Sequence, residues 1–331
     1  MAVTHLSHEP QKMTSTSKAD ARFFGFILSA FALSYIVAPM PEIARWVGFF
    51  FAAYAAVAND SIQTLGTFIA SNRKRPWYVL WAFAGGIFLV TMLYSWITYG
   101  GDVSYGRLAS KGFEQTPMHF SYLQVAAPIV LIVLTRLKMP VSTTFLLLTS
   151  FSTEMKAVSK VLMKSLSGYV LAFVLAFALW FFMQRQFAKW FTKPAHRNWA
   201  GAQWVTTGLL WSVWLQQDAA NIAVYLPRQL SGLEFAAFAG AVVVGLGWMF
   251  KSGGDRIQEV VDEKNNVTDI RAATTIDFLY AIILFYFKMY SQIPMSTTWV
   301  FLGLLGGREL AISLQSKGFG TDRTPSQAWK M

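Results

Sequence analysis

Two short polar motifs recur in an otherwise apolar chain, and both contain side chains that can bind ions. The first motif reads amide, acid, two spacers, amide, and its two copies are Asn59, Asp60 and Gln63, and Gln217, Asp218 and Asn221. Residues three or four apart share a helix face, so each copy can gather oxygen ligands around a hard cation such as Na⁺, or around a proton. An ionised acid at the centre of a membrane helix costs about 2.5–3.5 kcal/mol, which such a partner offsets. The alternative is a hydrogen-bonded polar cluster that holds helices together.

The second motif is Pro-x-Ser-Thr-Thr, which occurs at 140–144 and again at 294–298. Proline ends the preceding helix, and the Ser and Thr residues cap a new one. Free backbone N–H groups, hydroxyls and a positive helix end then favour an anion. The predicted anion contacts are Ser142, Thr143, Thr144, Ser296, Thr297 and Thr298. The alternative interpretation of each copy is an ordinary helix cap at a loop.

The spacing of the motifs indicates a duplicated chain. Asp60 and Asp218 lie 158 positions apart (218 − 60), and Ser142 and Ser296 lie 154 apart (296 − 142). The two motifs are unrelated, yet their copies are separated by nearly the same number of residues, which predicts two repeats. Transporters often bind substrate where such repeats meet. The predicted segments are a polar tail at 1–20, a first transmembrane repeat at 21–183, a basic cytoplasmic linker at 184–198, a second transmembrane repeat at 199–315, and a C-terminal tail at 316–331.

The elements that carry these motifs are predicted to be membrane-spanning helices. The 331 residues are 54% hydrophobic and only 14% charged, whereas soluble domains carry roughly 25% charged residues. The net charge of +11 falls in short clusters between apolar runs, which favours a multi-pass membrane protein over a nucleic-acid binder. We expect nine spans, near Phe23–Ala38, Trp46–Ala70, Trp77–Tyr99, His119–Leu137, Gly168–Met183, Trp199–Val224, Leu233–Phe250, Ile276–Tyr290 and Thr298–Leu314.

The basic clusters also predict sidedness. Arg73–Arg75 and the segment 184–198 are expected on the cytoplasmic side, and the charge-balanced loop Gly100–Thr116 outside. We therefore expect an all-α integral membrane protein that lies in the bilayer of the cell inner (plasma) membrane.

The motifs resemble those of the inorganic phosphate transporter (PiT) family. Members carry a Gly-Ala-Asn-Asp-x-Ala-Asn-Ala-x-Gly signature and a Pro-Val-Ser-Thr-Thr motif in each half, and here Ala58–Asp60, Asp218, Asn221 and both Ser-Thr-Thr copies match. The resemblance implies two inverted-topology repeats with broken helices or re-entrant hairpins. It also implies Na⁺- or H⁺-driven phosphate symport, with sulfate permeases as relatives. Na⁺ would bind at Asp60 and Asp218 and the anion at the Ser-Thr-Thr motifs.

Some positions depart from the family pattern. Gln63 and Gln217 replace asparagines, and Phe145 and Trp299 stand where the family usually has histidine. These departures leave the choice of cation and of anion open. Glu154 near Lys156 and Glu309 beside Arg308 are each expected to pair locally, a gating role being the alternative.

A passive anion pore needs a continuous polar lining, whereas the polar groups here gather at two stations. We expect neither an enzyme nor a bound cofactor, because the chain lacks the metalloprotease, nucleophile-elbow and P-loop motifs. A homodimer is compatible with the sequence.

Overall fold

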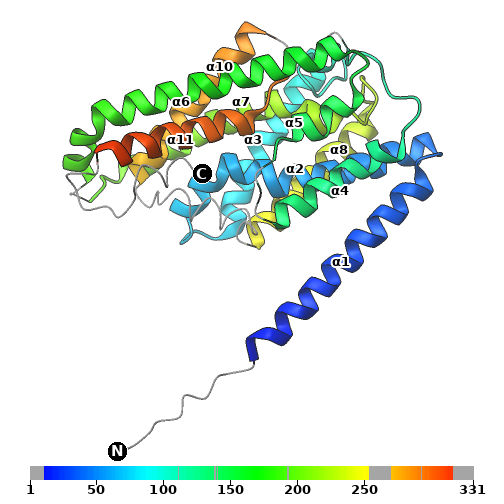
Figure 1. The fold of residues 1–331 in the computed structure, drawn as a ribbon, viewed down its shortest axis with the longest axis horizontal. Helices are drawn as coiled ribbons and strands as arrows, with labels where there is room; N and C mark the ends of the chain where they lie inside the picture. The colour runs from blue at the N-terminus through cyan, green and yellow to red at the C-terminus, as the bar shows by residue number, and fades with distance from the viewer. Residues whose placement is uncertain are drawn as a thin grey trace, which may run out of the picture.

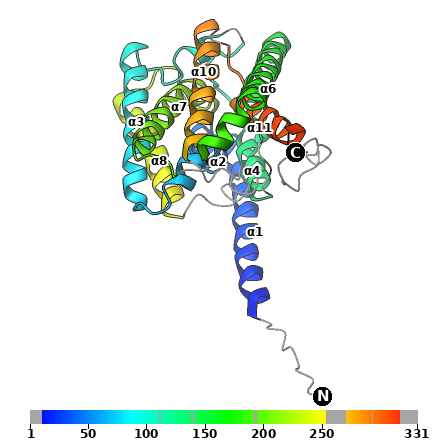
Figure 2. The same ribbon diagram turned by 90° about the vertical axis from the view of Figure 1, so that its left-hand side faces the viewer.

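The described part of the chain is built from helices that lie side by side in a bundle (Figures 1 and 2). The computed structural model describes residues 11–110, 112–137, 139, 141–191, 194–252, 270–291 and 293–315. Its helices are α1 (Gln11–Val37), α2 (Pro41–Ser71), α3 (Trp77–Thr98), η1 (Arg107–Ala109), α4 (Tyr122–Arg136), α5 (Thr143–Leu146), η2 (Leu148–Phe151), α6 (Met155–Phe191), α7 (Asn198–Ala223), α8 (Gly232–Lys251), α10 (Ile270–Tyr290) and α11 (Thr297–Gln315).

All nine predicted spans fall on helices of this structure. Some helices are longer than the predicted spans: α6 begins at Met155, before Gly168, and continues through Phe191, and α1 begins at Gln11. These additional segments extend helices whose cores are apolar, and propagating a formed helix costs less than starting a new one. The expected tail at 316–331 and Pro140 lie outside the described residues.

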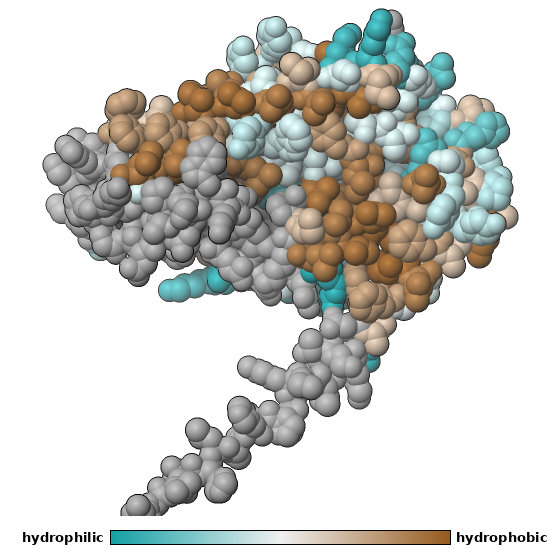
Figure 3. All heavy atoms as spheres, in the orientation of Figure 1, coloured by the Kyte–Doolittle hydropathy of each residue, from teal (hydrophilic) through white to brown (hydrophobic). Residues whose placement is uncertain are grey.

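Within the described part of the chain, four helices are long and apolar enough to cross a membrane: α3, α6 from Met155 to Met183, α8 and α10. Large hydrophobic side chains are exposed on their outer faces, for example Val90, Phe182 and Val244. Figure 3 shows hydrophobic residues spread along α6 and over the right-hand side of the bundle. Such a continuous apolar surface is what contact with lipid tails requires. Helices α2, α7 and α11, which carry the polar motifs, are not among the four.

Helices α2 and α7 form the centre of the bundle. Helix α2 contacts α4, α7, α8, α10 and α11, and α7 also packs along α10 and α3. The polar residues of both central helices are therefore shielded by their neighbours. Helix α1 packs against α2 and α4 along its second half, from Phe23 onward, and its first part projects away from the bundle (Figures 1 and 2).

Helices α6 and α11 approach each other closely because α11 presents glycines to α6. A Cβ atom on Gly303 would lie 2.4 Å from the carbonyl oxygen of Tyr169, and one on Gly307 would lie 2.2 Å from that of Phe173. Small residues four apart allow such backbone contact between membrane helices. This contact fixes α11, and with it the second Ser-Thr-Thr motif, against α6.

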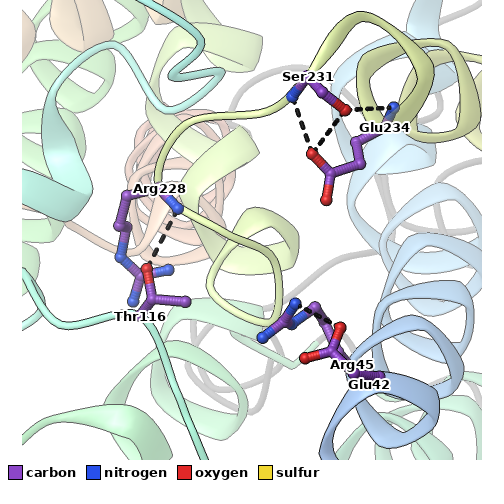
Figure 4. A network of polar contacts seen from close by, with 6 residues as sticks. All are labelled: Glu42, Arg45, Thr116, Arg228, Ser231 and Glu234. Atoms are coloured by element: carbon purple, nitrogen blue, oxygen red, sulfur yellow. Dashed lines mark hydrogen bonds and ion pairs between the residues drawn. The ribbon is translucent and has the colours of Figure 1, made fainter.

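The loop between α3 and α4 is tied to the end of α7 by Arg228. Its guanidinium donates to the carbonyl oxygens of Gln115 (2.6 Å) and Phe113 (3.2 Å), and its backbone N–H donates to Thr116 Oγ1 (3.3 Å; Figure 4). Burial lowers the pKa of Arg228 to about 10, so it stays charged at neutral pH. Figure 4 also shows the Ser231–Glu234 capping box that starts α8. These contacts hold the loop that carries η1 over the motifs.

Candidate functional site

The first acid–amide motif lies on α2 and is fully engaged in hydrogen bonds. Asp60 Oδ1 accepts from Asn59 Nδ2 at 2.7 Å, and Asp60 Oδ2 accepts from Thr143 Oγ1 at 2.6 Å. Gln63 Nε2 donates to Asn59 Oδ1 at 3.3 Å, one helical turn away, as the spacing predicts. Asn59 Nδ2 also donates to the carbonyl oxygen of Val141 at 2.7 Å, which joins α2 to the first Ser-Thr-Thr motif.

The second acid–amide motif, on α7, keeps three buried oxygen atoms without a hydrogen-bond donor. Asn221 Nδ2 donates to Asp218 Oδ1 at 2.6 Å, and Gln217 Nε2 donates to the carbonyl oxygen of Leu284 at 3.0 Å. Gln217 Oε1, Asp218 Oδ2 and Asn221 Oδ1 are buried and accept no hydrogen bond. A buried acceptor without a partner costs about 1–3 kcal/mol, so these three oxygens together would favour an electropositive ligand. Hard oxygen atoms of this kind suit an alkali cation.

The first Ser-Thr-Thr motif starts α5 and reaches into both acid–amide motifs. Ser142 caps α5 by accepting from the backbone N–H of Phe145 at 3.3 Å. Thr143 Oγ1 donates to Asp60 and accepts from Asn221 Nδ2 at 2.9 Å. Thr144 Oγ1 donates to the carbonyl oxygen of Met295 at 3.2 Å. A new helix starts after this motif as predicted, but α5 ends after one turn, at Leu146, so its dipole is small.

One continuous chain of hydrogen bonds therefore links the two acids. It runs from Asp60 through the Thr143 hydroxyl and the Asn221 amide to Asp218, with bonds of 2.6, 2.9 and 2.6 Å. The two carboxyl groups are also close enough to influence each other electrostatically. Residues 158 positions apart in the sequence (218 − 60) thus form a single cluster.

The second Ser-Thr-Thr motif starts α11 and faces the same cluster. Ser296 Oγ caps the helix by accepting from the backbone N–H of Trp299 at 3.3 Å, and the Thr297 side chain lies close enough to Asp218 to influence it electrostatically. Phe145 and Trp299, which follow the two motifs, pack with ring centroids 5.0 Å apart. Because α11 continues to Gln315, its N-terminus keeps the helix dipole that α5 lacks.

A small cavity of about 20 Å³ borders Asp218. Ser61 and Asp218 supply its polar lining, and the remaining walls are apolar, including Phe88, Trp211 and Trp214. A space of this size holds about one water-sized particle. A small ion or a single water therefore fits beside the acid, whereas a tetrahedral oxyanion does not.

Comparison with known proteins gives a match in fold but none to a family model or a curated sequence. No protein-family model and no curated protein matches the sequence. A solved structure described as "The sodium-dependent phosphate transporter" matches with a TM-score of 0.58 and 17% sequence identity, covering 88% of this chain and 94% of that one. The two proteins share a fold. Together with the apolar helices, this shows that the chain is an all-α, multi-pass membrane protein.

The predicted site residues come together as expected, while their functional roles stay predictions. All twelve are buried, and both copies of each motif contribute to the cluster described above. Thr143 and Thr144 use their hydroxyls to bind protein groups, which the sequence did not reveal. The expected local pairing of Glu309 is confirmed, since Arg308 Nη1 lies 2.7 Å from its Oε1.

A third buried acid was missed by sequence reasoning. Asp277 on α10 accepts from Thr67 Oγ1 at 2.8 Å and from Thr207 Oγ1 at 2.5 Å. It has only 1% of its surface exposed. Its position at the start of an apolar segment could have pointed to it. However, no amide flanks Asp277, and no matching acid lies 154–158 positions earlier in the chain.

Three buried or half-buried cations were missed as well. Arg107 lies on η1, Lys164 on α6 and Lys288 on α10. Each sits in a loop or near a helix end, where basic residues are ordinary, so the sequence gave no reason to place them near the motifs. Arg107 is nevertheless completely buried and lies near enough to Asp218 to interact with it electrostatically.

Proposed function

We propose that this protein is a secondary active transporter that moves inorganic phosphate together with Na⁺. The observation that carries the proposal is the hydrogen-bond chain Asp60–Thr143–Asn221–Asp218, which joins both acid–amide motifs to a Ser-Thr-Thr motif. A cation bound to the acids and an anion bound at the hydroxyls would touch the same side chains. The fold shared with a sodium-dependent phosphate transporter supports the assignment.

The cation is assigned first to the motif on α7. Gln217, Asp218 and Asn221 offer one unpaired oxygen each, whereas both oxygens of Asp60 already accept hydrogen bonds. The α7 motif is therefore ready to receive Na⁺ in this conformation, and the α2 motif would have to release Thr143 or Asn59 to do so. Na⁺ is here a transported substrate, and a proton on Asp218 is the alternative coupling ion.

The anion is assigned to the N-terminus of α11, with the hydroxyls of Ser296, Thr297 and Thr298. Helix N-termini carry free N–H groups and a positive dipole end, which favour phosphate. Thr297 lies beside Asp218, so a cation that neutralises this carboxylate also removes its repulsion of an incoming anion. By linkage, each ion then tightens the binding of the other.

Alternating access follows if residues 21–183 and 199–315 act as two inverted repeats that rock around this cluster. All twelve motif residues are buried here, so we assign the structure to an occluded state. Rocking would have to change the contacts between α5 and the start of α11, which include the 3.2 Å Thr144–Met295 hydrogen bond and the Phe145–Trp299 ring contact.

Uptake of labelled phosphate into proteoliposomes tests the proposal. Purified protein is reconstituted and given an inward Na⁺ gradient, an inward proton gradient, or neither. Accumulation above equilibrium that requires the Na⁺ gradient is the expected result, and accumulation that requires only the proton gradient would reassign the coupling ion. Uptake that ignores both gradients would show a passive pore. Unlabelled sulfate that competes at lower concentration than phosphate would make sulfate the substrate.

A further inference from the structure

Three cationic side chains from separate elements converge beside the second Ser-Thr-Thr motif. Arg107 Nε donates to the carbonyl oxygen of Gln216 at 2.7 Å, and Lys288 Nζ donates to Oε1 of the same glutamine. Arg107 Nη1 donates to the carbonyl oxygen of Ile293 at 3.4 Å, and Lys164 Nζ donates to that same oxygen. Gln216 and Ile293 therefore tie the three cations into one group, which we call the basic cluster.

The basic cluster carries more positive charge than its surroundings offset. Lys164 donates to the carbonyl oxygens of Ser291 (2.9 Å) and Ile293, and Lys288 to an amide oxygen. Among the described residues, neither lysine has a carboxylate partner. Asp218 acts on Arg107 electrostatically, so one acid faces three cations. Burial lowers the pKa of Arg107 to about 10, which leaves it protonated at neutral pH.

Burying cations of like sign together is costly unless an anion joins them. Arg107 is completely buried and Lys164 is 9% exposed. Carbonyl oxygens solvate an ammonium group only in part, and an ion taken out of water without a counter-ion costs several kcal/mol. A divalent oxyanion placed among these side chains would give the two lysines the negative partner that they lack among the described residues. Lysine and arginine are also the side chains that most often bind phosphate and sulfate.

The basic cluster lies directly beside the second copy of each motif. Ile293 directly precedes the segment Pro294–Thr298, and Gln216 directly precedes Gln217 and Asp218. Arg107 lies on the α3–α4 loop, and Lys288 lies in the last turn of α10. The cluster is thus on the side of this loop, which the charge pattern predicts to face outward.

We propose that Arg107, Lys164 and Lys288 form a second anion station, which binds a divalent tetrahedral oxyanion before it reaches the Ser-Thr-Thr motifs. The inference rests on the proposed function and adds to it a second anion-binding site on the outer side of the protein. The competing explanation is structural: the cations hold the backbone at Ser291 and Ile293 so that α11 starts in the right place. The two explanations differ in whether the positive charge of the lysines, rather than their hydrogen bonds to the backbone, sets the phosphate affinity.

Paired substitutions separate charge from shape. Lys288→Met and Lys164→Met remove the charge but keep a long unbranched side chain, while Lys288→Arg and Lys164→Arg keep the charge. The Met variants are expected to raise the half-saturating phosphate concentration by about tenfold or more at low salt, where charge interactions are least screened. Their half-saturating Na⁺ concentration should stay within about twofold, since they do not touch the acid–amide oxygens. The Arg variants should behave like the unmodified protein.

The salt dependence of phosphate affinity distinguishes the two explanations, because a purely structural role of the lysines would not make that affinity depend on salt. Added choline chloride should weaken phosphate affinity in the unmodified protein and much less in Lys288→Met. Equal affinity and equal salt dependence in both proteins would overturn the proposal. So would an Arg variant as damaged as its Met counterpart, because holding the backbone would then be the function of the lysine.

Binding to the detergent-purified protein keeps this inference separate from the proposed function. Calorimetric titration with inorganic phosphate, and separately with sulfate, should show binding that Lys164→Met weakens by about tenfold at low salt. If the unmodified protein binds these anions with that dependence but does not accumulate phosphate in vesicles, the transport proposal fails and the station stands. If it transports phosphate and the Met variants bind like the unmodified protein, the station fails and transport stands.

Discussion

Replacing Thr143 by valine removes the single hydroxyl that connects the two halves of the cluster. The Thr143 hydroxyl donates to Asp60 at 2.6 Å and accepts from Asn221 at 2.9 Å. Valine has nearly the same shape and stays β-branched, so the backbone of α5 should be unchanged. The substitution leaves one carboxylate oxygen and one amide N–H of the buried cluster without their partner.

The structure allows the size of this effect to be worked out. A hydrogen bond to an ionised carboxylate contributes about 1.5–3 kcal/mol, and one between neutral groups about 0.5–1.5 kcal/mol. Because neighbouring bonds in one network are not additive, we expect a combined loss of about 2–3 kcal/mol. At about 1.4 kcal/mol for each factor of ten, this corresponds to a change of about 30- to 140-fold in a binding constant.

The assay is the Na⁺ dependence of phosphate uptake in proteoliposomes. Thr143→Val should raise the half-saturating Na⁺ concentration by the factor above, because both partners of the hydroxyl belong to the acid–amide motifs. Thr144→Val is the matched control, since its hydroxyl makes one longer, neutral bond of 3.2 Å to Met295. We expect that control to change the Na⁺ dependence by less than about fivefold, which corresponds to about 1 kcal/mol. Thr143→Ser, which keeps the hydroxyl, should restore most of the affinity.

Equal effects of the two valine substitutions would refute the reasoning, because the hydrogen-bond chain would then carry no special weight. A Thr143→Ser variant as impaired as Thr143→Val would show that the methyl group, not the hydroxyl, matters. Thermal unfolding of each purified variant separates a change in ion binding from a loss of folded protein.

Three further predictions follow from the same contacts. Asp60→Asn and Asp218→Asn should each abolish Na⁺-driven uptake or uncouple it from the gradient, with membrane insertion unchanged; normal uptake kinetics in both would contradict the cation assignment. Gly307→Ala should destabilise the protein by about 1–3 kcal/mol, measured by thermal unfolding, because its Cβ would lie 2.2 Å from a carbonyl oxygen on α6. Gly240→Ala, where a Cβ meets nothing within 4 Å, serves as its control and should be neutral. Asp277→Asn should lower thermal stability by about 1–2 kcal/mol through a weakened bond to one threonine hydroxyl, yet leave the Na⁺ dependence within about twofold; a larger change in Na⁺ dependence would make Asp277 part of the ion path.

The sequence alone determined which helices exist and which residues form the motifs. Long apolar runs leave little choice but helix in a membrane, because each backbone N–H and C=O must be paired within its own segment. The Pro-x-Ser-Thr-Thr pattern likewise fixed the helix starts at Thr143 and Thr297, since proline and the serine cap act within a few residues. The i, i+3 and i, i+4 contacts within each acid–amide motif are local as well.

Only the tertiary structure decided which of these local sites meet and in what state. The contact of Thr143 with Asp60 and Asn221 depends on how three helices pack, and no short-range pattern encodes that distance. The same packing satisfies the α2 motif and leaves three oxygens of the α7 motif unpaired, although the two sequences follow one formula. Arg107 entered the site for the same reason: a loop held by Arg228 carries it over α7. Hydrogen bonds and charges act over a few ångströms in space, whatever their separation along the chain, so the fold alone sets them.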